Sequence, residues 1–213
     1  MPRRWLILAA ILIGAAALWA MRPPLAKTSP AKTAPAAALT ATTPTILSTD
    51  PIRGPTNAPL TIIEFSDLTC PTCATIESTL TELRALYGER LRIVWKDLPH
   101  LNSITGSRAL HIGARCAQAQ GKFWEYHDAI LDSATRSPAD VPAVADAIRL
   151  DLTAFTACVV NPQTAAKVDA GIIEARSLNI TDTPTFFVNG KVLHGSMSLT
   201  EFRELLDRPA PAQ

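Results

Sequence analysis

Hydrophobic and polar positions divide the chain into three parts. Residues 5–21 are an unbroken apolar run, residues 22–51 are rich in Ala, Pro and Thr, and residues 52–208 alternate between strand and helix patterns. We therefore predict a signal peptide or signal anchor at 1–21, a Pro/Ala/Thr-rich tether at 22–51 and one folded domain at 52–208. A single domain of this length lies within the usual range.

The folded domain begins with a strand, a helix and a second strand. Leu60–Phe65 and Leu91–Trp95 are short runs rich in β-branched and aromatic residues, typical of buried strands. Between these runs, and before Gly88, apolar residues recur at helical spacing: Ile76, Leu80, Leu83 and Tyr87. A strand, helix and strand in this order predict a parallel pair of strands.

A long helical stretch follows, from about residue 103 to 178. It is broken near Gly121, at Ser137-Pro138 and at Asn161-Pro162. This predicts an inserted subdomain made only of helices. The order of elements is then βαβ, a helical insert and a final ββα unit, which is an α/β fold.

The final ββα unit begins with a hairpin. Thr185–Val188 and Lys191–His194 are joined by Asn189-Gly190, a pair that suits a type I′ turn. Thr200 is placed to cap a last helix, and the apolar positions of that helix are Phe202, Leu205 and Leu206.

The first 21 residues have the layout of an export signal. Arg3 and Arg4 precede the apolar run, and Arg22 ends it. Seventeen residues in a helix span about 25 Å, slightly less than a hydrocarbon core of about 30 Å. Two outcomes stay open: cleavage after small residues near Ala15–Ala17, or retention of residues 5–21 as an inner-membrane anchor. Either places the folded domain in the periplasm or on the extracytoplasmic face, unless the run is a buried core helix.

The charge balance hides an uneven distribution. The chain has 20 Lys and Arg against 19 Asp and Glu, but residues 1–45 contain five basic residues and no acid. The rest of the chain therefore carries 15 basic and 19 acidic residues. No strong basic field is present to bind nucleic acid, so we expect no nucleic-acid partner.

The candidate chemistry lies at Cys70-Pro71-Thr72-Cys73, where the first strand gives way to a helix. A helix N-terminus carries unpaired N–H groups and a partial positive charge, which favour a thiolate over a thiol. Pro71 suits the first helical turn because it lacks an N–H. We therefore expect Cys70 to be the exposed nucleophile and Cys73, one turn inward, to be the resolving cysteine.

Two other interpretations of this motif are a zinc site and a purely structural disulfide. Structural zinc needs four ligands, usually from two close pairs, and the sequence has no second Cys-x-x-Cys. We expect no metal. The redox-active disulfide between Cys70 and Cys73 would carry the electrons itself, so no cofactor is expected either.

The residues Glu64 to Cys73, followed far downstream by Thr183 to Gly190, resemble a known family. Together with Gln120 to Asp128 in the helical stretch, they resemble the DsbA-like thiol:disulfide oxidoreductases, which have a thioredoxin-like fold with a helical insert. The match covers nearly all of the predicted domain. The resemblance implies the same fold and the same exchange chemistry.

The resemblance also implies roles for individual residues. Cys70 and Cys73 match the redox pair, and Pro71-Thr72 the active-site dipeptide, with Thr72 where the best-known oxidising member has His. Pro184 matches the family's cis-proline, which helps to bind an extended substrate, although a trans proline that starts an edge strand is the plain alternative. Thr183 matches a position that contacts the active-site sulfurs.

Glu64 lies six residues before Cys70, where the family often has a buried acid. A buried carboxyl group should have a raised pKa and could accept the proton of Cys73. The alternative is an ordinary exposed strand residue.

Cys116 and Cys158 both lie in the predicted helical insert. In an oxidising compartment two buried cysteines of one subdomain favour a structural disulfide. The alternative is two free thiols that pack as small apolar side chains.

The function expected from the sequence is therefore oxidation of thiols in folding, exported proteins. The partners would be unfolded or reduced exported proteins, and a membrane quinone-linked thiol oxidase as in the family. The same site could instead serve a disulfide isomerase or reductase, since the direction depends on the redox potential. From another class, a non-catalytic binding module or chaperone could use the groove beside Pro184.

Overall fold

A computed structural model describes residues 43–100 and 106–208 of the chain. The predicted signal or anchor at 1–21, most of the predicted tether and the first residues of the predicted insert lie outside these ranges. Within the described ranges, no helix has the length and apolar character needed to cross a membrane.

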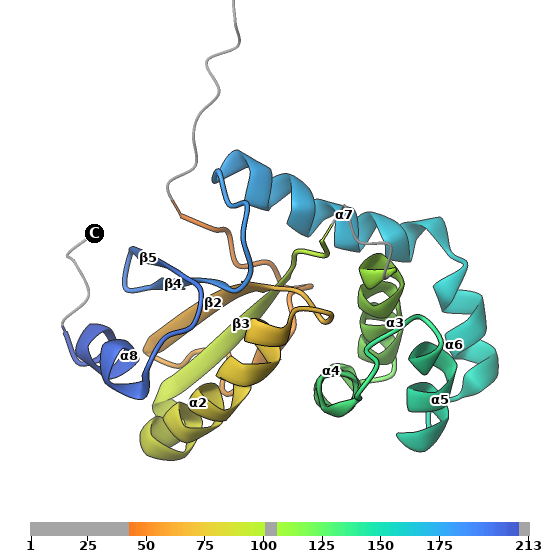
Figure 1. Ribbon diagram of the computed structural model, residues 1–213, viewed down its shortest axis with the longest axis horizontal. Coiled ribbons are helices and arrows are strands. Elements are labelled where there is room, and N and C mark those ends of the chain that lie inside the picture. The colour runs from red at the N-terminus through yellow and green to blue at the C-terminus, as the bar shows by residue number, and fades with distance from the viewer. Residues whose placement is uncertain (1–42, 101–105, 209–213) are drawn as a thin grey trace, which may run out of the picture. The chain divides into compact units, whose positions relative to one another are not determined.

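A five-stranded sheet forms the centre of the folded domain (Figure 1). Its order is β1-β3-β2-β4-β5; β2 and β3 are parallel, and the other neighbours are antiparallel. The strands are β1 (Ile52–Arg53), β2 (Leu60–Ser66), β3 (Leu91–Asp97), β4 (Thr185–Val188) and β5 (Lys191–His194). The parallel pair predicted from the βαβ pattern is therefore present.

The strand boundaries follow the sequence patterns closely. Both predicted early strands run slightly further, to Ser66 and Asp97. The hairpin turn has left-handed backbone at Asn189 (φ 47°) and Gly190 (φ 76°), as a type I′ turn requires. Strand β1 was not predicted, because two residues are too few to form a recognisable pattern.

Helices α2 (Pro71–Tyr87) and α8 (Leu199–Leu206) cover one face of the sheet, and a 3₁₀ turn, η1 (Gly88–Arg90), follows α2. Alternate residues of β2 point to this face, so Ile62 packs with Ile76 of α2 and Phe202 of α8. Thr200 does not cap α8. Ser198 does, because its hydroxyl accepts from the Glu201 backbone while the Glu201 carboxylate accepts from the Ser198 backbone, a capping box.

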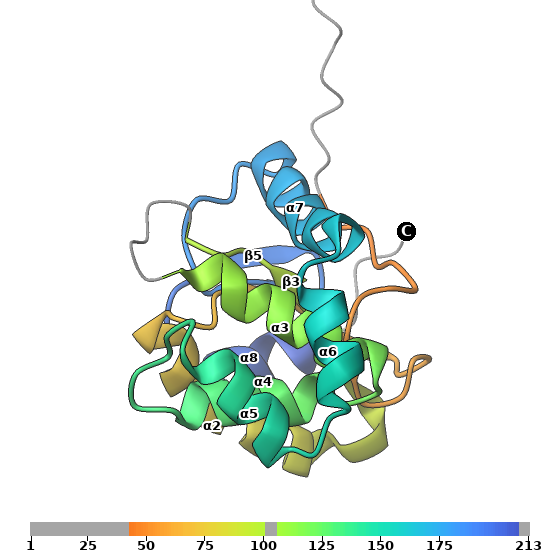
Figure 2. The same ribbon diagram turned by 90° about the vertical axis from the view of Figure 1, so that its right-hand side faces the viewer.

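Among the described residues, five helices separate β3 from β4 in the chain (Figure 2). They are α3 (Ser107–Ala119), α4 (Phe123–Asp132), α5 (Asp140–Ala147), α6 (Leu152–Val159) and α7 (Pro162–Ser177). Helices α3 to α6 share a hydrophobic core with Leu68 and Trp95. The α/β thioredoxin-like fold with an inserted helical subdomain is thus confirmed.

Helix α7 returns the chain to the second face of the sheet. Ala175 packs there with Ile63 and Val94. A Cβ atom at Gly171 would clash with the Asp97 carbonyl, so glycine allows α7 to approach the end of β3 closely.

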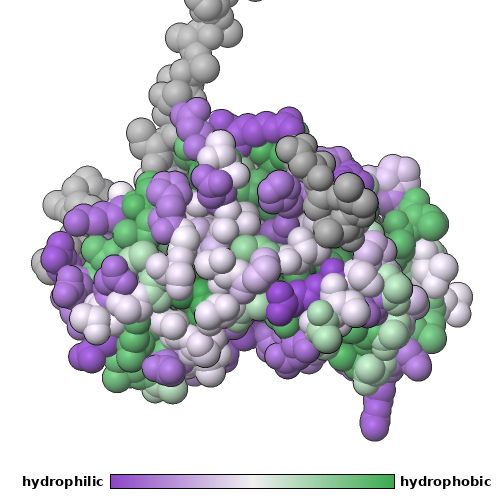
Figure 3. All heavy atoms as spheres, in the orientation of Figure 1, coloured by the Kyte–Doolittle hydropathy of each residue, from purple (hydrophilic) through white to green (hydrophobic). Residues whose placement is uncertain are grey.

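The segment before β1 is attached to this second face. The ammonium group of Lys96, whose side chain is only 2% exposed, binds Asp50 at 2.6 Å and Glu174 at 2.9 Å. It also donates to the carbonyl of Thr45 at 2.6 Å. Residues 45–50 are therefore held by a buried cation, although their sequence resembles the tether. Over the face drawn in Figure 3, polar and apolar residues are interspersed.

Candidate active site

Cys70 is the N-cap residue of α2, directly after the turn that leaves β2. Its backbone is extended (φ −74°, ψ 122°), and its sulfur accepts a hydrogen bond from the Cys73 backbone N–H at 3.2 Å. Pro71 occupies the first helical position, where no N–H donor is needed. The sequence motif thus places a sulfur atom at the positive end of a helix.

This position makes Cys70 acidic. The largest influence is a hydrogen bond from the Cys73 thiol to the Cys70 sulfur, which lowers the pKa of Cys70. Partial burial opposes this, while Thr183 and the backbone N–H groups of Cys73 and Thr72 lower the pKa further. The result is a pKa of about 6. Cys70 is partly exposed to solvent. It can therefore be a thiolate near neutral pH and can meet another protein.

Cys73 has the opposite character. It is 1% exposed, and burial raises the pKa of its thiol well above the ordinary range; donation to Cys70 raises it further. Both cysteines are free thiols in this structure. The pair therefore combines a partly exposed, acidic thiol with a buried one that keeps its proton.

Glu64 lies on β2, on the face that α2 covers, and is 1% exposed. It is not the exposed strand residue of the alternative interpretation. Burial, and next the nearby carboxylate of Glu77, raise the pKa of Glu64 well above its usual range. Its Oε1 atom has no hydrogen-bond partner among the residues described. Such a group keeps its proton to a higher pH than an ordinary carboxyl group, which suits proton exchange with a neighbouring thiol.

Ser66 lies between Glu64 and the cysteine pair. It is fully buried, and its hydroxyl lies near enough to lower the pKa of both Glu64 and Cys73. The hydroxyl makes no hydrogen bond of ordinary geometry within the described ranges. Sequence reasoning did not select Ser66, although its place two residues after Glu64 puts it on the same face of β2.

The peptide bond between Thr183 and Pro184 is cis. This turn lies beside the cysteine pair, because the Cys70 sulfur is 3.6 Å from the Thr183 carbonyl oxygen. Pro184 is buried, and its own carbonyl accepts from the Gly195 backbone at 2.8 Å. Two sites more than a hundred residues apart in the sequence therefore meet at Cys70.

A cavity of about 690 Å³ opens next to Cys70. Apolar atoms from Leu98, Pro99, Ile172 and Ile180 line it. Polar groups lie around them, including Thr183 and the charged side chains of Arg176 and Asp182. A cavity of this size, lined by both apolar and polar groups, can receive a stretch of polypeptide whose cysteine reaches Cys70.

Asp67 organises the turn that precedes Cys70, and sequence reasoning missed it. Its carboxylate accepts from the Thr69 backbone at 2.9 Å, the His100 backbone at 3.0 Å and the Ser107 hydroxyl. Its backbone carbonyl accepts from the Cys70 N–H at 3.1 Å. Although burial opposes ionisation, hydrogen bonds from His111 and these donors hold the pKa of Asp67 below its usual range. The only local signal was an acid placed to form an Asx turn before the helix.

A buried imidazole connects this turn to the helical insert. His111 of α3 is fully buried, with Nδ1 2.7 Å from Asp97 and Nε2 3.4 Å from Asp67. Burial opposes its protonation, but the two carboxylates outweigh burial and raise the pKa of His111. The guanidinium of Arg115 also binds Asp97. The insert is thus joined to the active-site turn by ionic groups removed from water.

Within the part of the chain that the structure describes, one group of side chains has the residue types of a metal site. Potential ligand atoms of Glu77, His127 and Asp128 lie within 4.8 Å of one another. However, Asp128 accepts two hydrogen bonds from Arg53, at 2.6 and 2.8 Å, and also lies 2.8 Å from His127 Nδ1. Only His127 Nε2 and Glu77 could then face a cation, fewer than a stable zinc site needs.

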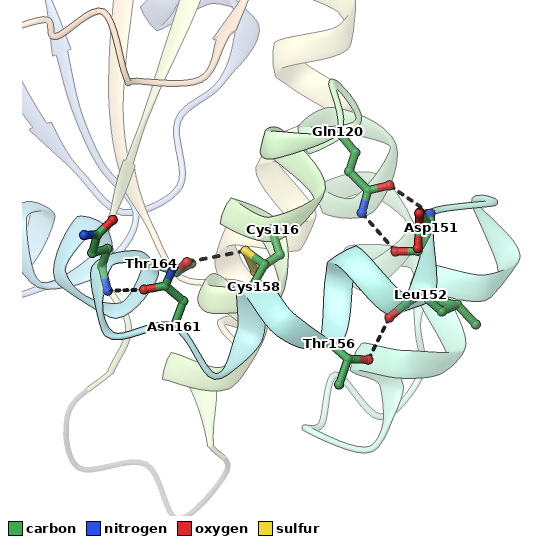
Figure 4. The surroundings of a disulfide bond; sticks show 9 residues. Cys116, Gln120, Asp151, Leu152, Thr156, Cys158, Asn161 and Thr164 are labelled. Atoms are coloured by element: carbon green, nitrogen blue, oxygen red, sulfur yellow. Dashed lines mark hydrogen bonds between the residues drawn. A yellow bond between two sulfur atoms is a disulfide. The ribbon is translucent and has the colours of Figure 1, made fainter.

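Cys116 and Cys158 form a disulfide between α3 and α6, 42 residues apart in the sequence (Figure 4). Near it, the Gln120 side chain exchanges two hydrogen bonds with the Asp151 backbone, at 2.8 and 3.2 Å. Cys116 is fully buried in the core of the insert. The four cysteines therefore form two pairs, one free beside the cavity and one bridged within the insert.

Comparison with known proteins agrees with this fold. The family model described as thioredoxin matches residues 47–208. The structure is similar to a thioredoxin-like oxidoreductase from Silicibacter pomeroyi (24% identity, TM-score 0.71), covering 78% of this chain and 95% of that one. It is also similar to the thiol-disulfide exchange protein α-DsbA2 from Wolbachia pipientis (19% identity, TM-score 0.67), covering 75% of this chain and 87% of that one.

Sequence relatives include Na⁺/H⁺ antiporters named NhaA. Those from Salinispora arenicola and Herminiimonas arsenicoxydans are each 34% identical, over 151 and 152 residues. The alignments cover 70% and 69% of this chain but only 23% of either antiporter. The chain thus spans about a quarter of the length of these curated relatives.

The family match covers the whole sheet, the cysteine pair and the helical insert. The similarity to the solved structures shows that they share the fold. The chain belongs to the thioredoxin family and has the DsbA-like form of its fold.

Proposed function

We propose that this protein is an exported thiol:disulfide oxidoreductase that introduces disulfides into folding proteins. The observation that carries the proposal is the asymmetry of the cysteine pair. Cys70 is partly exposed with a pKa of about 6, whereas Cys73 is buried and protonated. A low thiol pKa makes Cys70 a good leaving group, which favours transfer of the disulfide from the enzyme to a substrate.

The reaction starts from the oxidised pair. A substrate thiolate attacks Sγ of Cys70, the Cys70–Cys73 bond breaks, and Cys73 leaves as a thiolate. Because Cys73 is buried, it takes up a proton. Glu64, whose raised pKa favours its protonated form and which lies on the same buried face, is the proposed donor through the Ser66 hydroxyl. A mixed disulfide between the substrate and Cys70 results.

The second step releases the product. Another substrate thiolate attacks the substrate sulfur of the mixed disulfide, and Cys70 leaves as a thiolate. The substrate has lost two electrons and gained a disulfide, while the enzyme now holds a dithiol. The N–H groups at the start of α2 stabilise the departing Cys70 thiolate.

Substrate binding is assigned to the cavity and to the Thr183-Pro184 turn. The apolar lining suits side chains that are exposed only before a protein has folded, so we propose unfolded or reduced exported proteins as substrates. No cofactor is needed beyond the cysteine pair. The dithiol must be reoxidised, and a membrane quinone-linked thiol oxidase is the proposed partner.

Export is part of the proposal. The basic and apolar pattern of residues 1–21 supports export to the periplasm, with residues 5–21 either removed or kept as an anchor. A disulfide between Cys116 and Cys158 also suits an oxidising compartment.

Two assays run side by side test the direction of the reaction. Oxidised protein is incubated with a reduced, unfolded substrate, and reduced protein with a disulfide-containing one, while the potential of the pair is measured against glutathione. We expect fast oxidation, slow reduction and a potential more oxidising than that of thioredoxin. Efficient reduction with poor oxidation would instead identify a reductase or isomerase, and no exchange at all would identify a binding module.

A further inference from the structure

The buried resolving cysteine raises a problem of proton supply. Cys73 gains a proton whenever the pair is reduced and loses one whenever it is oxidised, yet it is 1% exposed. Glu64, the proposed partner, is equally buried. At 1% exposure each group meets bulk water only rarely, so rapid proton exchange needs other side chains that connect them to the surface.

The unpartnered polar atoms on this face of the sheet trace such a connection. Of the four buried side-chain polar atoms without a hydrogen-bond partner in the described part of the chain, three are Glu64 Oε1, Ser66 Oγ and His127 Nε2. An unpartnered buried polar atom is costly and calls for a specific explanation. A group that alternately donates and accepts a proton has such an explanation.

Glu77 connects the Glu64 and Ser66 side chains to that of His127. It lies one helical turn after Cys73, and its nearby negative charge raises the pKa of Glu64. The Oε1 atom of Glu77 is 3.7 Å from His127 Nε2. Its side chain is 20% exposed, so it lies between the buried groups and the surface.

His127 continues the path outward. Its ring is fully buried and packs edge-on against Trp95, with centroids 4.8 Å apart. Nδ1 lies 2.8 Å from the Asp128 carboxylate, whose side chain is 50% exposed and held by Arg53. If Nδ1 donates to Asp128, the free Nε2 can accept a proton from Glu77 while Nδ1 releases one outward.

We propose that Ser66, Glu64, Glu77 and His127 form a proton path between the Cys73 thiol and the surface at Asp128. This rests on the proposed function and assigns new roles to Glu77 and His127. When the pair is reduced, one proton moves inward to the departing Cys73 thiolate. When Cys73 attacks a mixed disulfide at Cys70, its proton moves outward and the partner leaves as a thiolate.

The charged groups around the path favour proton movement. Burial has the largest influence on Glu77 and raises its pKa. The nearby guanidinium groups of Arg53 and Arg84 lower it. Asp128 on α4 raises the pKa of Glu77, and the charge of His127 lowers it. A carboxyl group whose pKa is raised in this way keeps its proton to a higher pH than an exposed one, which suits a group that passes a proton on.

Closure of the disulfide by Cys73 isolates the step that needs the path. Reduced protein is mixed with excess oxidised glutathione, samples are quenched with acid, and intact mass distinguishes the Cys70 mixed disulfide from the closed pair. The rate is followed against pH in the wild type and in Glu77→Gln and His127→Gln. Glu82→Gln, an exposed acid on the same helix, is the matched control.

We expect closure to be about ten- to a hundredfold slower in Glu77→Gln and His127→Gln below neutral pH. The difference should narrow as pH rises, because hydroxide can then remove the proton. Formation of the mixed disulfide and the rates of Glu82→Gln should match the wild type. A merely structural role for Glu77 or His127 would not produce a defect that vanishes at high pH.

Closure at the wild-type rate in both variants, at all pH values, would overturn the path. If His127→Gln does not fold, Glu77→Gln decides alone, since its side chain is partly exposed. Failure of the proposed function is distinguishable. A protein that reduces rather than oxidises its substrates would still close the pair through the path, whereas an unreactive Cys70 would slow the first step in the wild type itself.

Discussion

The two cysteine pairs share one domain but differ in every property that governs their chemistry. Cys70 and Cys73 are free thiols three residues apart at a helix N-terminus, and the sulfur of Cys70 reaches a cavity. Cys116 and Cys158 are 42 residues apart and join two helices within a core, without a helix N-terminus behind either sulfur. Reactivity therefore follows from the electrostatics at the sulfur, and stabilisation from the length of chain that a bridge restrains.

Removal of the first pair should have the larger effect on activity. In Cys70→Ser the nucleophile is absent, and we expect substrate oxidation to fall to the uncatalysed rate, a loss of at least about a thousandfold. In Cys73→Ser, mixed disulfides with substrate should accumulate and be visible by non-reducing electrophoresis. Oxidation by Cys70→Ser at the wild-type rate would show that another thiol is the nucleophile.

Removal of the second pair should affect stability instead. Replacement of both Cys116 and Cys158 by Ala frees a loop of about 40 residues in the unfolded chain, and we expect a loss of about 3–4 kcal/mol in the free energy of unfolding. Denaturant unfolding of the oxidised protein measures it. Substrate oxidation should persist where the variant is folded; a variant that is stable but inactive would contradict the division of roles.

Asp67 should matter to the first pair and not to the second. In Asp67→Asn an amide replaces a carboxylate that accepts from Thr69, His100 and Ser107, so we expect a loss of about 2 kcal/mol in unfolding free energy. The control is Asp182→Asn, which changes an exposed acid that lines the cavity beside Cys70. The Cys70 alkylation rate should fall in the Asp67 variant alone. An equal effect in both variants would contradict a special role for this turn.

The smallest effect concerns pH and stability. The folded pKa of Cys70, about 6, lies below the ordinary thiol value of about 8.5. The thiolate therefore stabilises the reduced, folded protein fully above the ordinary value, and this contribution is lost as pH falls through about 6. The difference in unfolding free energy between reduced wild type and Cys70→Ala should grow with pH over this window. A constant difference would show that Cys70 has an ordinary pKa.

Local patterns predicted the parts of the fold that local interactions determine. The runs that became β2 and β3, the Asn189-Gly190 turn and the helix start at Cys70 depend on neighbours in the sequence. The capping box at Ser198 also has a local signal, because Glu201 follows three residues later, and this pair outweighs the predicted cap at Thr200.

Long-range contacts account for what the sequence did not reveal. Asp67 binds Ser107 and approaches His111, some forty residues away, through the docking of α3. Glu77 meets His127 only because α2 and α4 lie on the same face of the sheet. Lys96 is a buried charged residue within the strand β3. Nothing in the sequence around it indicates that Asp50 and Glu174 will bind its ammonium group.

The acidity of Cys70 relative to Cys73 can be measured directly. Reduced protein is alkylated with iodoacetamide across a range of pH, and peptide mass spectrometry identifies which cysteine is labelled. Cys70 should react with a midpoint at about pH 6, while Cys73 stays unlabelled in the folded protein. Labelling of Cys73 first, or a midpoint for Cys70 near that of a free thiol, would contradict the asymmetry on which the proposed function rests.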